Sequence, residues 1–153
     1  MDLPKDTKEN LPSGSVLTEN STGFHDGFYY SFWSDTPGAV TMTLEEAGCY
    51  SSQWSGVNNW VGGKGWNPGA TRVVSYEADF QPDGNSYLAL YGWTRDPLIE
   101  YYVVDAWGSW RPPDGTAAGF LESDGGEYDI YTTIRENQPS IEGIRTFTQF
   151  WSV

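Results

Sequence analysis

Residues Tyr87–Asp105 read YLALYGWTRDPLIEYYVVD, and this stretch decides the fold class. It holds two runs rich in aromatic and apolar residues, Tyr87–Arg95 and Leu98–Trp107, with Asp96-Pro97 between them. Such runs around a turn signal predict two strands joined by a short connection. Glu100 lies inside the second run, although strands disfavour Asp and Glu and an ionised carboxylate is costly to bury without partners. Because local rules are most often broken where function requires it, Glu100 is the first candidate functional residue.

The period of two in a strand sets which side chains share a face with Glu100. The second run places Tyr102 on that face, and matching faces of the preceding and last strands carry Tyr91 and Gln149. If these faces line one concavity, Glu100 has hydroxyl and amide donors around it on an aromatic floor. That environment suits a carboxylate that cleaves sugars, since rings stack on pyranoses while their polar ends bond hydroxyls.

The remainder of the chain also indicates an all-β fold. From Gly23 onward, short strand-like runs alternate with turn sequences, and no stretch sustains a helical period of 3.6 residues. The other expected strands are Phe28–Ser34, Ala39–Leu44, Tyr50–Trp54, Asn59–Val61, Thr71–Phe80, Gly119–Leu121, Glu127–Arg135 and Arg145–Val153. This pattern predicts one sandwich or barrel domain over residues 23–153. Residues 1–22 are polar without a period, so we expect them to be a flexible leader.

Charge and composition exclude several classes of partner. Eight Lys and Arg against 21 Asp and Glu give a net charge of -13, which disfavours nucleic acid and anionic membranes and suits a neutral polymer. The aromatic content of 16% fits either a sugar-binding surface or a sandwich core rich in rings. Cys49 and His25 are each the single residue of their type, which argues against a disulfide, a His-based metal site and a Ser-His triad.

Several segments resemble the family 11 glycoside hydrolases, the small β-jelly-roll endo-1,4-β-xylanases. The segments are VGGKGWNPG, GWTRDPLIEYYVV, SDGGEYDIYTTIR, NQPSIEG and TFTQFWSV, and the resemblance runs from about Phe28 to Val153. It implies a β-jelly-roll sandwich of two twisted antiparallel sheets with a substrate cleft and a thumb loop. It also implies a secreted monomer that acts on xylan without a cofactor or metal.

The resemblance assigns roles to particular residues. Glu100 matches the nucleophile of a retaining double displacement, in which a second carboxyl protonates the leaving oxygen. Gln149 matches a residue that donates a hydrogen bond to the nucleophile, and Tyr91 and Tyr102 match tyrosines that flank it and the central sugar.

Outside the centre of the cleft, the resemblance implies further contacts with substrate. Trp33 matches a platform that stacks on a xylose. The sequence does not fix which face of its strand Trp33 lies on, so a place in the core is the alternative. Tyr87 matches a cleft tyrosine that could equally be a packing residue. Arg135 and Pro139 match a sugar-contacting arginine and a backbone contact in the thumb, Gln138–Gly143. Asn59 matches the neighbour of the acid/base.

The second carboxyl is where the sequence departs from the family pattern. The chain ends at Val153, before the segment that carries the acid/base glutamate in the family, so we expect a sequence incomplete at its C-terminus. Asp105 is a poor substitute, because its odd offset from Glu100 puts it on the other face and about 16 Å along the strand. A retaining pair is about 5–5.5 Å apart. Asp105 is therefore rejected. Glu77 and Asp79 lie on a different expected strand and Glu142 lies on the thumb, so none of the three is favoured as a substitute. We expect the isolated chain to be poorly stable with little activity.

Two alternatives from other functional classes stay open. A non-catalytic, lectin-like β-sandwich could bind xylan through the same aromatic face. A structural β-domain could use all of its aromatic residues in the core.

Overall fold

A computed structural model describes residues 11–153, and within this range the chain forms strands and no helix. The prediction of an all-β fold is therefore confirmed. No helix in residues 11–153 has the length and apolar character needed to cross a membrane. The chain divides into two compact units, one ending at Val73 and the other beginning at Val74.

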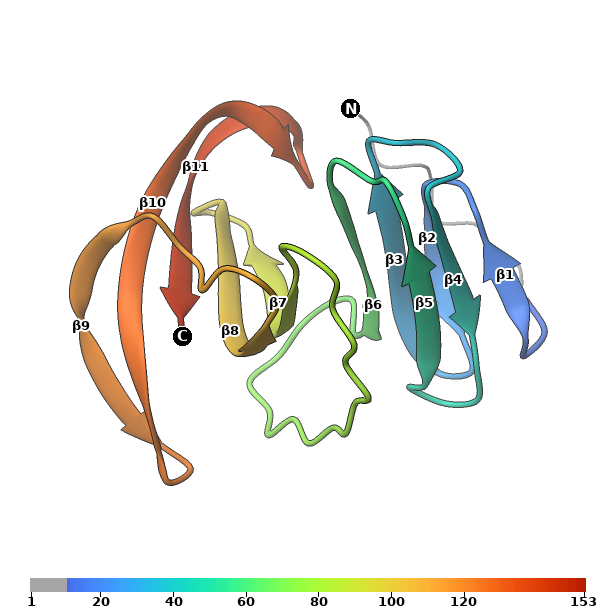
Figure 1. Ribbon diagram of the computed structural model, residues 1–153, viewed down its shortest axis with the longest axis horizontal. Coiled ribbons are helices and arrows are strands. Elements are labelled where there is room, and N and C mark those ends of the chain that lie inside the picture. Colours follow the sequence, from blue (N-terminus) through green and yellow to red (C-terminus); the bar gives the residue numbers. More distant parts are fainter. Residues whose placement is uncertain (1–10) are drawn as a thin grey trace. The chain divides into compact units, whose positions relative to one another are not determined.

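The first unit is a sandwich of two three-stranded antiparallel sheets (Figure 1). One sheet has the strand order β1-β4-β5 and the other β2-β3-β6. The strands are β1 (Ser15–Leu17), β2 (Ser21–His25), β3 (Phe28–Ser34), β4 (Val40–Leu44), β5 (Tyr50–Trp54) and β6 (Trp60–Gly65). Tyr30 and Phe32 of β3 pack against Val40, Met42 and Leu44 of β4 in a buried core. Alternate residues of both strands are buried, as the period of two requires.

Residues 11–22 differ from the flexible leader that the sequence predicted. Ser15–Leu17 forms β1 in antiparallel pairing with β4, Leu17 belongs to the core, and β2 begins at Ser21. A strand of three residues is too short to show alternation, which is why its sequence gave no signal. The leader residues 1–10 lie outside the described part of the chain.

The second unit is built on one five-stranded sheet with the order β7-β8-β11-β10-β9 (Figure 1). Its strands are β7 (Tyr87–Thr94), β8 (Ile99–Trp107), β9 (Thr116–Ser123), β10 (Gly126–Ser140) and β11 (Gly143–Ser152). Three of the pairs are antiparallel, but β11 runs parallel to β8. The described residues thus form three sheets where the sequence led us to expect two, and one pair departs from the antiparallel pattern.

The segment 71–80 is not the strand that its alternation predicted. It belongs to none of the sheets in the described residues, and Val73 is 93% exposed. Alternation reports that a segment could cover a surface, whereas a strand also needs a neighbour to accept its backbone hydrogen bonds. One anchor of this segment is the Tyr76 hydroxyl, which donates to Oδ2 of Asp105 on β8.

Candidate active site

Four neighbouring strands of the five-stranded sheet place one residue each in a single row. Trp93 on β7 is the register partner of Glu100 on β8, which is the partner of Gln149 on β11. Gln149 is in turn the partner of Thr133 on β10. We call these four residues the Glu100 row. Register partners share a face, so all four side chains lie on the same side of the sheet.

The adjacent row on that face is aromatic. It runs Tyr91, Tyr102, Trp151 and Tyr131, in the same strand order. Tyr102 and Trp151 are stacked, with ring centroids 3.8 Å apart and planes within 1° of parallel. The Tyr91 ring lies 5.0 Å from that of Tyr102. The alternation of the sequence had predicted that Tyr91, Tyr102 and Gln149 share the face of Glu100, and the structure confirms this.

Both oxygens of the Glu100 carboxyl group accept a hydrogen bond from the sheet face. The Tyr91 hydroxyl donates to Oε2 over 2.7 Å, and the Gln149 amide Nε2 donates to Oε1 over 2.5 Å. Glu100 is only 7% exposed and Gln149 8%. A buried carboxylate needs such donors, because burying it without partners costs roughly several kcal/mol of folding free energy. The two hydrogen bonds therefore offset the cost of burying the Glu100 carboxylate in a strand.

The tyrosines beside Glu100 stay protonated over a wide pH range. Burial raises the pKa of the Tyr91 hydroxyl well above its ordinary value, and the charge and hydrogen bond of Glu100 raise it further. Burial also raises the pKa of Tyr102 well above the usual range, with smaller contributions from Tyr91 and Glu100. At neutral pH Tyr91 is consequently a donor to the carboxylate and cannot compete with it for negative charge.

Three further residues form hydrogen bonds with this arrangement. The sequence did not identify them as functional residues. Trp93 Nε1 donates to the Tyr91 hydroxyl over 2.7 Å. Thr133 Oγ1 donates to Gln149 Oε1 over 2.5 Å, and Trp151 Nε1 donates to Thr133 Oγ1 over 3.3 Å. Trp93 and Trp151 lie two residues after Tyr91 and Gln149 on their strands, so the period of two is the signal that could have found them. Thr133 could be placed there only once the register of β10 against β11 was known.

The other predicted residues of the second unit lie on β7 and β10. The Tyr87 ring packs against Trp151 at 6.0 Å and Trp110 at 6.3 Å, and burial raises the pKa of its hydroxyl. Arg135 is exposed, is the register partner of Phe147, and donates to Gln138 Oε1 over 3.3 Å. Pro139 is exposed in the last residues of β10, opposite Ile144.

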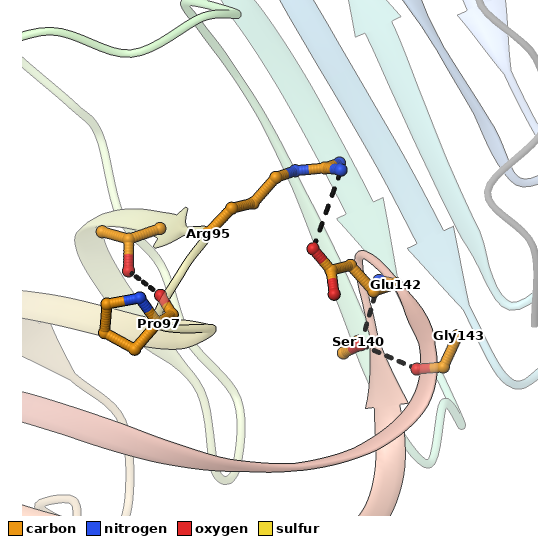
Figure 2. A network of polar contacts seen from close by, with 6 residues as sticks. Arg95, Pro97, Ser140, Glu142 and Gly143 are labelled. Carbon is orange, nitrogen blue, oxygen red and sulfur yellow. Dashed lines mark hydrogen bonds and ion pairs between the residues drawn. The ribbon is translucent and has the colours of Figure 1, made fainter.

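The thumb, Gln138–Gly143, is tied to the connection between β7 and β8. The guanidinium of Arg95 lies 3.7 Å from Oε1 of Glu142. Figure 2 shows the Arg95 side chain reaching across to Glu142 in the thumb. Within the thumb, the Ser140 hydroxyl donates to the Gly143 carbonyl over 2.7 Å and accepts from the Glu142 amide over 3.0 Å. The pair joins the thumb to the end of β7, where Trp93 lies two residues before Arg95.

Trp33 and Asn59 belong to the first unit. On β3, Tyr30, Phe32 and Ser34 are buried, so Trp33 lies on the opposite face, beside its register partner Val61. Trp33 is therefore not a core residue of the sandwich. Asn59 is exposed before β6, where its backbone amide donates to Asp35 Oδ1 over 2.8 Å. A hydrogen bond from the Asn58 side chain and then this amide lower the pKa of Asp35.

The carboxylates considered as substitutes for the second acid have other surroundings. Asp105 accepts from the hydroxyls of Tyr76 and Tyr128, and Tyr128 lies on the face of β10 opposite to Thr133. Glu142 is paired with Arg95. Glu77 and Asp79 are exposed in the segment that forms no strand. These surroundings give no support to a pairing with Glu100.

The fold and the site together define an all-β protein with a buried, doubly hydrogen-bonded carboxylate on an aromatic sheet face. Comparison with known families identifies the group to which it belongs. The model for "Glycosyl hydrolases family 11" matches residues 25–153, and the chain belongs to this family.

Three curated relatives are similar along most of this chain. It is 56% identical over 145 residues to endo-1,4-beta-xylanase 11B of Humicola insolens, covering 94% of this chain and 50% of the relative. It is 56% identical over 138 residues to ethylene-inducing xylanase 1 of Verticillium dahliae, covering 89% and 62%. It is 57% identical over 139 residues to endo-1,4-beta-xylanase 3 of Pyricularia oryzae, covering 89% and 59%. The chain thus spans between 50% and 62% of the length of these relatives.

Proposed function

We propose that this chain takes part in the hydrolysis of internal β-1,4-xylosidic bonds of xylan, with retention of configuration and with Glu100 as the nucleophile. The observation that supports this most strongly is the Glu100 carboxyl group itself, buried on an aromatic face with one donor on each oxygen. Membership of glycosyl hydrolase family 11 and the xylanase names of the relatives support the substrate and the reaction.

In the proposed reaction, a Glu100 oxygen attacks the anomeric carbon and the bond to the leaving sugar breaks. A second carboxyl protonates the leaving oxygen, and water then attacks the anomeric carbon and releases Glu100 from the ester. The donors Tyr91 and Gln149 suit both steps. They hold the carboxylate in place before attack, and they stabilise the charge that returns to it when the ester breaks.

The remaining contacts with substrate are proposed from membership of glycosyl hydrolase family 11. Tyr102, Tyr91 and Tyr87 would pack against the sugar rings. Arg135 would contact them from β10, and the backbone of Pro139 would contact them from the thumb. For Trp33 and Asn59 of the first unit the proposal rests on the family match alone: Trp33 would stack on a xylose, and Asn59 would be the neighbour of the acid/base. Because xylan is an extracellular polymer, we expect the protein to be secreted. We also expect it to act as a monomer.

An aryl xylobioside with a dinitrophenolate leaving group tests the nucleophile separately from the acid, because this leaving group needs no protonation. With fluorine at C2 of the sugar, the glycosyl-enzyme should accumulate. We expect one equivalent of dinitrophenolate, and a mass gain on the peptide that contains Glu100. Glu100→Gln should show neither, whereas the control Glu122→Gln, an exposed residue of β9, should match the parent chain.

Equal labelling of the Glu100→Gln variant would contradict the proposal. Retarded migration in xylan gels without any glycosyl-enzyme would instead support the non-catalytic xylan binder. Absence of both labelling and retardation would support a structural domain.

A further inference from the structure

The two hydrogen-bond chains that end on Glu100 each begin at a tryptophan. One runs from Trp93 through Tyr91 to Oε2, and the other from Trp151 through Thr133 and Gln149 to Oε1. An indole N–H can donate a hydrogen bond but cannot accept one. The direction of each chain is therefore set at its start.

In the longer chain, the direction passes through the Thr133 hydroxyl. Its oxygen accepts from Trp151 Nε1, so its proton is free to point at Gln149 Oε1. With Oε1 occupied as an acceptor, the Gln149 amide must present Nε2 to Glu100. The reversed amide would place an oxygen against the carboxylate and the NH2 group against Thr133. The Thr133 hydroxyl and the Glu100 carboxylate thus both favour the same one of two orientations of Gln149 that fill the same space.

Packing holds the two starting points in place. The Trp151 ring is stacked on Tyr102 at 3.8 Å, and the Trp93 ring lies 4.8 Å from Phe147. The Thr133 methyl group faces Gly115, where a side-chain Cβ would lie only 2.9 Å from it. Gly115 therefore leaves the space that this methyl group occupies.

We propose that Thr133, with Trp151 and Trp93, acts as a set of positioning residues that orient two donors onto Glu100 and keep both of its oxygens as acceptors. The proposal rests on the proposed function only for its catalytic consequence. The orientation itself is a property of the free protein, so it can be measured whether or not xylan is cleaved.

The test compares Thr133→Val, which keeps the shape and removes the hydroxyl, with Thr133→Ser, which keeps the hydroxyl. Thr132→Val is the matched control, because Thr132 is the residue before Thr133 on β10 and lies on the opposite face. Solution NMR of the ¹⁵N-labelled chain follows hydrogen exchange at the Trp151 indole and the Gln149 side-chain amide.

We expect Thr133→Val to accelerate exchange at both groups by roughly threefold to tenfold, the size expected for loss of one hydrogen bond. Thr133→Ser and Thr132→Val should leave the rates near those of the parent chain. Unchanged rates in Thr133→Val, or an equal change in Thr132→Val, would overturn the proposal.

Steady-state kinetics with the dinitrophenyl xylobioside test the effect of Thr133 on catalysis. Thr133→Val should lower kcat by a similar factor with KM nearly unchanged, and Thr133→Ser should restore it. If the parent chain releases no dinitrophenolate, the proposed function fails, and the exchange rates alone decide the positioning role. If turnover is present and Thr133→Val matches the parent chain in both readouts, the positioning role fails while the function stands.

Discussion

Glu100 and Gln149 face each other across the parallel pair β8–β11, and the Gln149 amide donates to the Glu100 carboxyl over 2.5 Å. They are 49 residues apart in the sequence, and both are more than nine-tenths buried. Gln149 also accepts from Thr133, so one amide satisfies a charged group on one side and a hydroxyl on the other.

Replacing Gln149 by Leu should destabilise the second unit as well as the site. The variant leaves Oε1 of Glu100 without its donor and Thr133 without its acceptor, which costs about 1–3 kcal/mol for each buried group left unsatisfied. Urea denaturation followed by tryptophan fluorescence measures the loss. Gln138→Leu, in the half-buried start of the thumb, is the control and should change the free energy of unfolding far less. Equal losses in the two variants would contradict this account.

Tyr91 and Tyr102 predict a loss of stability in alkali. Their pKa values are raised well above 10 in the folded chain, mainly by burial, while the unfolded chain ionises them near their ordinary value of about 10. Above that pH the unfolded state has released protons that the folded state keeps. The free energy of unfolding should therefore fall by about 1.4 kcal/mol per pH unit for each tyrosine.

Urea denaturation midpoints measured from about pH 9 to about pH 12 test this slope. The range is chosen to lie on both sides of the ordinary tyrosine pKa of about 10. Tyr91→Phe should make the decline with pH shallower, and Tyr91→Phe with Tyr102→Phe shallower again. A double variant whose stability falls as steeply as that of the parent chain would show that other groups control the alkaline limb.

The contact between Arg95 and Glu142 should restrain the thumb without adding much stability. The two groups are 3.7 Å apart, and the Arg95 side chain is 64% exposed, so salt should screen their attraction. Glu142→Gln should speed amide exchange in residues 140–143 with little change in the denaturation midpoint. In high salt, the parent chain should approach the exchange rates of the variant. Thumb exchange that is insensitive to both changes would show that the ion pair does not restrain it.

Lys64 should stabilise the folded state of the first unit. Its ammonium group donates to the Glu45 carbonyl over 2.7 Å and the Ala47 carbonyl over 2.5 Å, and it lies 3.0 Å from His25 Nδ1. Lys64→Met removes all three contacts, and we expect a loss of about 1–3 kcal/mol measured by urea denaturation.

The same Lys64 variant should accelerate amide exchange in the turn 45–48 between β4 and β5. Lys64→Arg keeps the charge while changing the geometry, and should lose less stability. A larger loss in Lys64→Arg than in Lys64→Met would show that side-chain size, not hydrogen bonding, controls this position.

The sequence predicted the strands and the shared face of Glu100 because both follow from local alternation. It could not predict the parallel pairing of β8 with β11, since register between distant strands depends on the whole sheet. Thr133 was missed for that reason, as its role depends on lying opposite Gln149. The segment 71–80 was assigned wrongly for the complementary reason, because a pattern of alternation contains no information about whether a neighbouring strand is present.

The parallel neighbours β8 and β11 also determine when the site can assemble. A parallel pair cannot be joined by a tight turn, and here the chain passes through β9 and β10 before β11 enters between β8 and β10. Such distant pairings form slowly, because the connecting chain must be ordered first. During synthesis, Glu100 therefore leaves the ribosome well before Gln149, and the carboxylate acquires its second donor only when the central strand inserts. The folding of this sheet and the completion of the hydrogen bonds to Glu100 are therefore the same late event.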